Sequence, residues 1–85
     1  IGLNYKVQRD SVKALEYYEK LVNEHPGYVG TYYHLGKLYE ALNRKDDAIK
    51  IYERGMEAAQ KKRDNHAFAE LKVVYQEATG FDDDY

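Results

Sequence analysis

The stretch that decides the fold is YYHLGKLYEALNRKDDAIKIYERGMEAA, residues 32–59. Its apolar residues recur every three or four positions, which is typical of helices that bury one face. The first stripe is Tyr32, Leu35, Leu38, Tyr39 and Leu42, and the second is Ala48, Ile49, Tyr52, Gly55, Met56 and Ala59. The polar residues 43–47 between the stripes predict a turn. The stretch therefore indicates two helices packed as a hairpin.

Short local signals predict where the helices end. Asn43 tolerates the left-handed conformation that often ends a helix, and Asp46 or Asp47 can cap the next helix. Residues 26–27 are Pro-Gly, which cannot continue a helix, and the polar residues 9–11 predict a further turn. The expected helices lie near residues 1–8, 11–24, 29–42, 46–62 and 66–79.

The chain also repeats itself at one fixed offset. Seven positions match 34 residues apart: Ile1 with Leu35, Gly2 with Gly36, Tyr5 with Tyr39, Ala14 with Ala48, Leu15 with Ile49, Tyr18 with Tyr52 and Glu19 with Glu53. Small residues such as Gly36 and Ala48 let paired helices approach closely. Large ones such as Tyr52 fill the space between helices, and the ten tyrosines are expected mainly in the core with hydroxyls reaching water. A period of this length indicates stacked helical repeats.

These residues resemble the tetratricopeptide repeat family, whose unit carries a large aromatic residue, Leu-Gly, Tyr, Ala, an aromatic residue, a small residue and Pro. Residues 29–62 match all but the final proline, where Gln60 stands, and residues 1–28 form an earlier unit that lacks its first six positions. The third unit fits only after a two-residue shift, which puts Leu71 and Tyr75 at the Leu and Tyr positions.

The resemblance implies an all-α fold, a right-handed α-solenoid of antiparallel helix pairs with about five helices. A single domain is expected over residues 1–80, with units at 1–28 and 29–62, a closing helix at about 65–79 and an acidic tail at 81–85. The closing helix carries a stripe of Phe68, Leu71, Val74 or Tyr75, and Ala78, and its polar residues can cover the end of the stack.

Members of that family typically bind peptides from other proteins on a concave wall, which the first helix of each pair builds. The positions that match this wall are Leu3, Lys6 and Val7 in the first unit and Gly30, Tyr33, Lys37, Glu40 and Ala41 in the second, with Ala69, Val73 and Gln76 on the closing helix. Tyr33 and Lys37 lie four apart on one helical face. An aromatic side chain beside a cation suits a peptide with an apolar anchor and a nearby acid, although both could equally be ordinary surface residues.

One subtype of the family grips the C-terminal carboxylate of chaperone tails with two asparagines among basic residues. This chain departs from that subtype, because Leu3 and His34 stand where the asparagines are wanted. A free carboxylate could still meet Lys6 and Lys37, but without the amide clamp. The resemblance thus implies a protein or peptide partner of another kind.

A second interpretation is a structural repeat element that forms homo-oligomers or belongs to a longer repeat protein. About three units are needed for a stable stack, and the first unit is incomplete. The open N-terminal edge is expected to expose Leu15, Tyr18 and Val22, with Tyr17 near them. Such an edge invites a second copy or further upstream residues.

Composition argues against catalysis and against most other ligands. With no cysteine, the chain has no disulfide or thiolate chemistry. The three histidines, His25, His34 and His66, lack the spacing of a metal site, and no glycine-rich phosphate loop is present. A net charge of −2 disfavours nucleic acid. We expect no enzyme activity, no cofactor and no metal. No membrane span or signal peptide is visible, and a cytoplasmic location is the default expectation.

Overall fold

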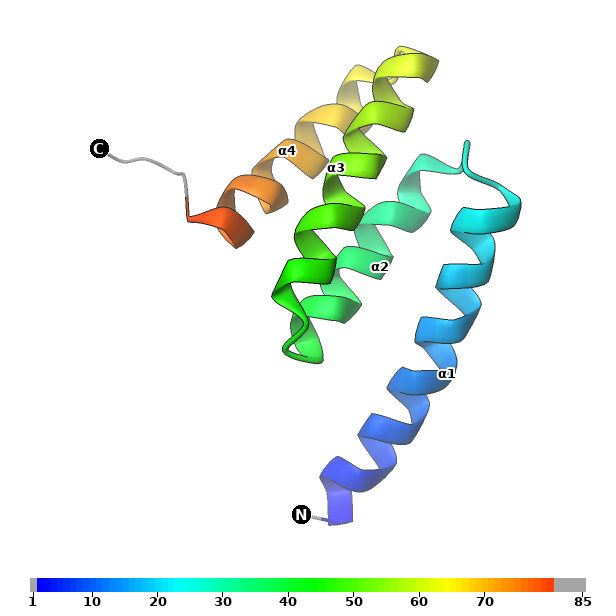
Figure 1. Cartoon of the computed structure of the whole chain (residues 1–85), viewed down its shortest axis with the longest axis vertical. Coiled ribbons are helices and arrows are strands. Elements are labelled where there is room, and N and C mark those ends of the chain that lie inside the picture. Colours follow the sequence, from blue (N-terminus) through cyan, green and yellow to red (C-terminus); the bar gives the residue numbers. More distant parts are fainter. Residues whose placement is uncertain (1, 81–85) are drawn as a thin grey trace.

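The computed structural model of the chain describes residues 2–80, with side chains from residue 11 onward. Within this range four helices follow one another: α1 Gly2–Glu24, α2 Val29–Ala41, α3 Lys45–Lys62 and α4 Asn65–Thr79. Residues 2–80 contain no strand. Figure 1 shows α1 beside α2, with α3 crossing in front of α2 and running beside α4. The predicted all-α stack of antiparallel helices is confirmed.

The turn predicted at residues 9–11 is absent, so four helices form within the described range where the sequence predicts about five. The helix α1 runs through Arg9, Asp10 and Ser11 without interruption. These residues include neither Pro nor Gly, and each lowers helix propensity by at most about 0.7 kcal/mol relative to Ala. The N-terminal part of α1 therefore continues away from the other helices (Figure 1) and does not fold back beside residues 11–24.

Most of the other helix ends follow the local residues. Asn43, just after α2, has a φ of 62°, and Gly80, which ends α4, has a φ of 78°. Both therefore adopt the left-handed conformation that ends a helix. Asp64 caps α4, because its carboxylate accepts a hydrogen bond from the backbone N–H of Ala67 at 3.1 Å.

The cap predicted for α3 is wrong. Arg44 occupies the N-cap position, and no side chain there accepts a hydrogen bond from the helix. Asp46 and Asp47 lie instead in the first turn of α3, where a negative charge still favours the positive end of the helix dipole. Asp47 is also held by Arg44, whose Nε lies 2.8 Å from its Oδ2.

The core forms where small residues bring the helices together. Gly36 on α2 faces the ring of Tyr52 on α3, and a Cβ at that glycine would lie only 2.1 Å from the Cε1 of Tyr52. Gly55 packs in the same way, because a Cβ there would lie 2.6 Å from the Cβ of Tyr32. Tyr52 and Leu35 are fully buried. The predicted close approach at Gly36 is thus confirmed.

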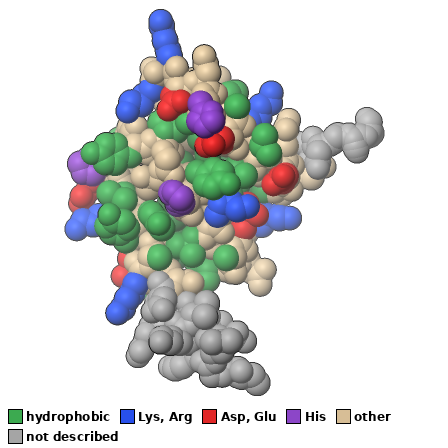
Figure 2. Space-filling view, turned by 180° about the vertical axis from the view of Figure 1, so that it is seen from behind, with side chains coloured by type: hydrophobic (Ala, Val, Ile, Leu, Met, Phe, Trp, Pro, Cys, Tyr) green, Lys and Arg blue, Asp and Glu red, His purple; other side chains and the backbone are tan. Residues whose placement is uncertain are grey.

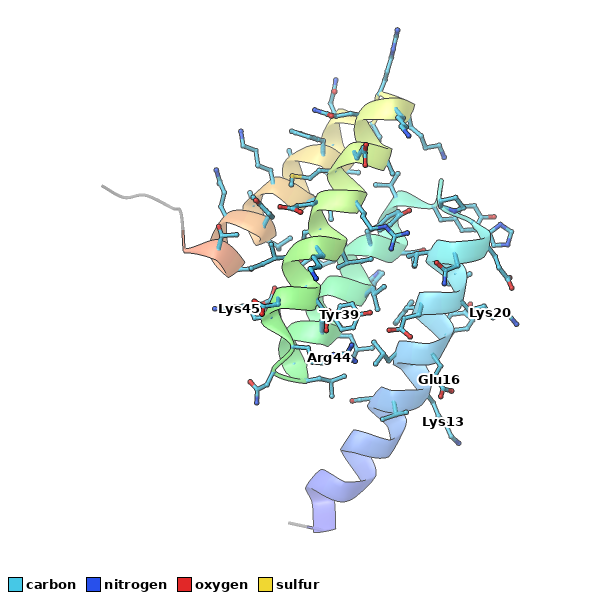
Figure 3. All side chains as sticks on the ribbon, in the orientation of Figure 1. Lys13, Glu16, Lys20, Tyr39, Arg44 and Lys45 are labelled. Atoms are coloured by element: carbon cyan, nitrogen blue, oxygen red, sulfur yellow. The ribbon has the colours of Figure 1, made fainter. Side chains whose placement is uncertain are left out.

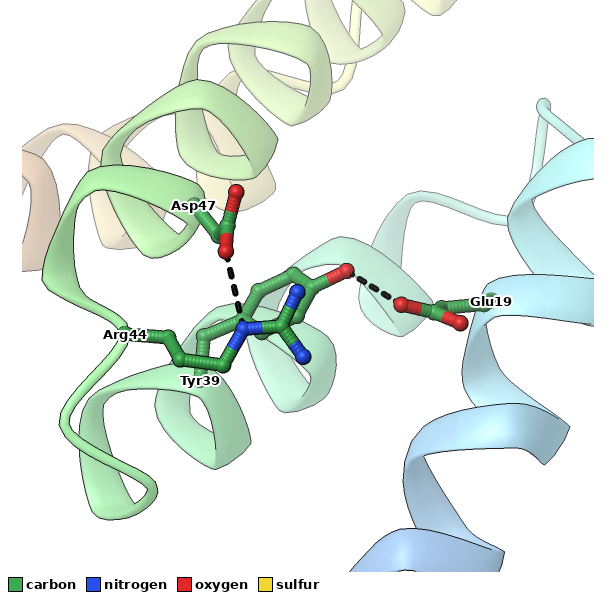
Figure 4. Close-up of polar contacts among 4 residues, drawn as sticks. All are labelled: Glu19, Tyr39, Arg44 and Asp47. Atoms are coloured by element: carbon green, nitrogen blue, oxygen red, sulfur yellow. Dashed lines mark hydrogen bonds and ion pairs between the residues drawn. The ribbon is translucent and has the colours of Figure 1, made fainter.

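A tyrosine–glutamate hydrogen bond recurs between successive units. Tyr39 on α2 donates its hydroxyl to Glu19 on α1 at 2.6 Å (Figure 4), and Tyr75 on α4 donates to Glu53 on α3 at 3.0 Å. The glutamates are 34 residues apart (53 − 19) and the tyrosines 36 apart (75 − 39). This difference of two confirms the shifted register of the closing helix, in which Leu71 is buried.

We expect the fold to lose stability as the pH rises above about 10. Burial, and then the hydrogen bond to Glu19, raises the pKa of Tyr39 from 10.0 to about 12. Because the folded-state pKa lies above the unfolded value, the neutral hydroxyl stabilises the fold. That stability is complete below the unfolded pKa and is lost as the pH rises through the folded pKa.

The melting temperature, followed by circular dichroism from about pH 8 to pH 12, checks this expectation. The Tyr39→Phe variant has no phenolic proton to lose, so its melting temperature should fall less steeply over this range. Tyr28→Phe, at a side chain that is 59% exposed, is the matched control and should keep the wild-type slope. Equal slopes for the wild type and Tyr39→Phe would contradict the assignment.

Candidate protein-binding surface

The predicted wall positions of the second and third units lie on α2 and α4. In Figure 1, α3 lies in front of these two helices, so the view from behind in Figure 2 looks onto them. Hydrophobic side chains gather across the middle of that face, with charged side chains among them and around the margin. We call the set Tyr33, Lys37, Glu40, Ala69, Val73 and Gln76 the α2–α4 surface.

The two helices contribute matched positions to this surface. Under the 36-residue register, Lys37 corresponds to Val73 (73 − 37 = 36) and Tyr33 to Ala69 (69 − 33 = 36). Lys37 is exposed, and Tyr33 is half-buried because its ring packs against the core. Val73 is 53% exposed, although it is a large hydrophobic residue. The surface therefore offers a ring that is anchored in the core, an exposed cation and an exposed apolar side chain.

Glu40 serves the fold as well as the surface. Its Oε2 accepts a hydrogen bond from the hydroxyl of Tyr52 at 2.6 Å, and its side chain is half-buried. Burial of Tyr52, and then this hydrogen bond, raises the pKa of the tyrosine above its ordinary value. One carboxylate oxygen of Glu40 is therefore engaged in joining α2 to α3, which the sequence did not indicate.

Leu3, Lys6 and Val7 fall on the N-terminal part of α1, and their side chains lie outside the described residues. That part of the helix continues in line with the rest of α1 and away from α2 (Figure 1). The contribution of these three residues to a binding wall stays a prediction.

The N-terminal edge differs from the sequence expectation. Leu15 is only 9% exposed and Val22 only 2% exposed, so neither contributes to an open edge. Tyr18 is half-buried, and Tyr17 is the exposed residue, at 61%. The correction arises because α1 turns its Leu15 and Val22 stripe toward the core, and Lys13, Glu16 and Lys20 project from its outer side (Figure 3).

A row of aromatic rings, which the sequence did not predict, crosses from α1 to α2. Tyr18 stacks on His34 with ring centroids 6.0 Å apart and an interplanar angle of 17°. The row continues on one side to Tyr17, at 5.6 Å, and on the other to Tyr33, at 5.9 Å. Adjacent aromatic pairs in the sequence, at 17–18 and 33–34, were the available signal, but only the packing of α1 on α2 joins them.

A separate recess of about 340 Å³ lies between the turn after α1 and the C-terminal half of α3. Its lining includes Tyr32, Arg54 and Lys62. Lys62 donates to the carbonyl of Gly27 at 3.0 Å, and Tyr32 donates to the carbonyl of Pro26 at 2.7 Å. These polar atoms therefore fasten the turn to the neighbouring helices.

The described part of the chain contains neither a metal site nor a membrane-spanning helix. No group of three His, Cys, Asp or Glu side chains in that part is arranged to hold a metal ion. None of its helices is long and apolar enough to cross a membrane.

Comparison with known protein families agrees with the stacked helical repeats described above. A sequence model of the tetratricopeptide repeat matches residues 8–78. The chain belongs to the tetratricopeptide repeat family. Proteins of this family are in general non-catalytic scaffolds, and the family membership supports a general protein–protein interaction module for this chain.

Solved tetratricopeptide repeat structures resemble the chain closely. A solution NMR structure of a tetratricopeptide repeat domain protein from Salinibacter ruber is 40% identical, with a TM-score of 0.82, and the match covers 98% of this chain and 84% of that one. A crystal structure of a tetratricopeptide repeat domain protein from the same organism is 41% identical, with a TM-score of 0.80, covering 94% and 90%. No curated protein matches the chain.

Proposed function

We propose that this tetratricopeptide repeat binds an extended or helical segment of another protein across the α2–α4 surface, without catalysis and without a cofactor. The observation that carries the proposal is Val73, a large hydrophobic side chain that is 53% exposed on α4. It occupies the position of α4 that corresponds to Lys37 on α2 (73 − 37 = 36). Val73 belongs to the α2–α4 surface, on the face across which hydrophobic side chains gather (Figure 2), and a contiguous apolar patch of this kind is suited to meet a partner.

The chemistry of the surface indicates what the partner segment carries. Tyr33 is half-buried against the core. Its side chain would therefore lose little further conformational freedom on binding. An apolar residue of the partner can pack against Tyr33 and Val73, and an acidic residue can pair with the exposed Lys37. A few buried anchors of this kind supply most of the affinity of a peptide interface.

Charge reversal at Lys37 tests the proposal. A partner captured from the native lysate and identified would be titrated against the wild type, Lys37→Glu and Tyr33→Ala by isothermal calorimetry. We expect each variant to weaken binding about tenfold or more, as the loss of a central contact does. Lys50→Glu, at an exposed lysine on α3, reverses the same charge elsewhere and should bind normally. If Lys37→Glu and Tyr33→Ala fold normally and bind as the wild type does, the surface is wrongly assigned.

A further inference from the structure

Equivalent residues of the two units differ in how well they are covered. Ala48 and Tyr52 on α3 are fully buried, at 0% exposure, and α2 packs on the ring of Tyr52 through Gly36. Their counterparts 34 residues earlier, Ala14 and Tyr18 on α1, are only half-buried. This Ala14–Tyr18 face therefore lacks a covering helix of the kind that α2 provides to α3.

The repeat indicates which segment should cover this face. Gly36 is the residue of α2 that packs on the ring of Tyr52, where a Cβ would lie 2.1 Å from the Cε1 atom. Gly2 precedes Gly36 by 34 residues, just as Tyr18 precedes Tyr52. Residues 2–8 thus carry the sequence of a covering helix for the Ala14–Tyr18 face.

One copy of the chain cannot make this contact in the observed structure. The helix α1 is continuous from Gly2 to Glu24. Gly2 and Tyr18 are 16 residues apart (18 − 2), so at 1.5 Å per residue they stand about 24 Å apart along the same axis. The covering segment points away from the body of its own chain (Figure 1).

We propose that two copies exchange these segments, so that residues 2–8 of each copy pack on the Ala14–Tyr18 face of the other. The two α1 helices then run antiparallel, as α2 and α3 do within the second unit. The contact is self-complementary, because Gly2 of each copy meets Tyr18 of its partner copy. In the second unit the equivalent residues, Gly36 and Tyr52, are 16 apart (52 − 36), so the register of the exchange matches a pairing that the fold already uses.

The exchange predicts a dimer whose formation depends on the straight course of α1. Light scattering after gel filtration, at about 50 μM, should give about twice the chain mass of 10.0 kDa. Ser11→Pro removes the N–H that bonds to the carbonyl of residue 7 and adds a clash there. Asp10 would then suit the N-cap of a new helix, and the introduced proline would suit its first position. This variant should fold residues 2–8 back onto its own face and become a monomer.

Matched variants separate this effect from simple loss of structure. Ser11→Ala leaves the helix continuous and should remain a dimer. Tyr18→Ala should lose the dimer, whereas Tyr28→Ala, at a tyrosine that is 59% exposed on the turn before α2, should keep it. Circular dichroism confirms that each variant is helical. A monomeric wild type, or a Ser11→Pro variant that remains a dimer, overturns the proposal.

A mixing experiment shows directly which copy covers the face. Because the chain has no cysteine, Lys6→Cys can carry a single nitroxide spin label on an unlabelled copy. Mixed with a ¹⁵N-labelled wild-type copy, it should broaden the amide signals near Ala14 and Tyr18 of the ¹⁵N copy. If these amide signals are not broadened, residues 2–8 fold back within one chain or pair elsewhere. That result would overturn the proposed exchange. Neither result depends on the peptide partner of the α2–α4 surface.

Discussion

Replacing Gly36 by leucine is expected to lower the free energy of unfolding by about 1–3 kcal/mol or more. A Cβ at this position would lie 2.1 Å from Cε1, 2.5 Å from Cζ and 2.6 Å from Cδ1 of Tyr52. The ring has nowhere to move, because it is fully buried and its hydroxyl is bonded to Glu40 at 2.6 Å. The helices α2 and α3 must therefore separate to admit the new side chain.

Gly30 provides the control in the same helix. A Cβ at Gly30 would meet no atom within 4 Å, and its φ is not positive. Gly30→Ala is therefore expected to leave stability unchanged or to raise it by up to about 1 kcal/mol, because alanine loses less backbone freedom on folding. Urea denaturation followed by circular dichroism measures both variants. A Gly36→Leu protein as stable as Gly30→Ala would show that the close contact with Tyr52 does not exist.

Truncating Tyr52 to alanine should have a still larger effect, with a loss of about 3–5 kcal/mol. Tyr52 is fully buried and is among the largest such side chains in the core. Its removal leaves a cavity between α2 and α3 and leaves Glu40 without its partner. Native domains have only about 5–15 kcal/mol of stability in total, so this one change should bring the protein close to unfolding.

Tyr52→Phe separates the ring from its hydroxyl. The phenylalanine keeps the packing against Gly36 but cannot donate to Glu40, and a hydrogen bond to a charged group contributes about 1.5–3 kcal/mol at most. Glu40 is half-buried and can turn its carboxylate toward water. The free energy of unfolding should therefore fall by about 1.5 kcal/mol or less. In urea denaturation, the Tyr52→Phe protein should therefore have a clearly larger free energy of unfolding than the Tyr52→Ala protein. Equal losses would mean that the hydroxyl and not the ring holds α3 in place.

A double-mutant cycle tests the contact between Gly36 and Tyr52. Gly36→Ala should be damaging when the ring of Tyr52 is present and nearly harmless once Tyr52→Ala has removed it. The losses of the two single variants should then not add, since residues in direct contact couple by about 0.5–3 kcal/mol. Strict additivity would place the two residues out of contact.

The tyrosines show what spacing along a single helix predicts and what it does not. Their spacing on the apolar stripes predicted that rings such as those of Tyr32, Tyr39 and Tyr52 lie in the core, and each is at most 8% exposed. The sequence predicts that their hydroxyls reach water. Instead, Tyr39 and Tyr52 donate to glutamates on neighbouring helices. Spacing along one helix identifies a buried face, whereas the acceptor on a neighbouring helix depends on how the two helices pack.

Whereas the contact of Gly36 with the ring of Tyr52 came from the structure, the sequence by itself determined the helices α2, α3 and α4, the 34-residue repeat and the apolar stripe that each of these helices buries. These features depend on i→i+4 hydrogen bonds and on stripes that one helix displays alone. Only the tertiary structure decided that α1 continues through residues 9–11 and that Val73 remains uncovered. The physical reason is that Arg9, Asp10 and Ser11 change helix stability by less than about 1 kcal/mol each. The local residues therefore do not decide whether the chain turns there.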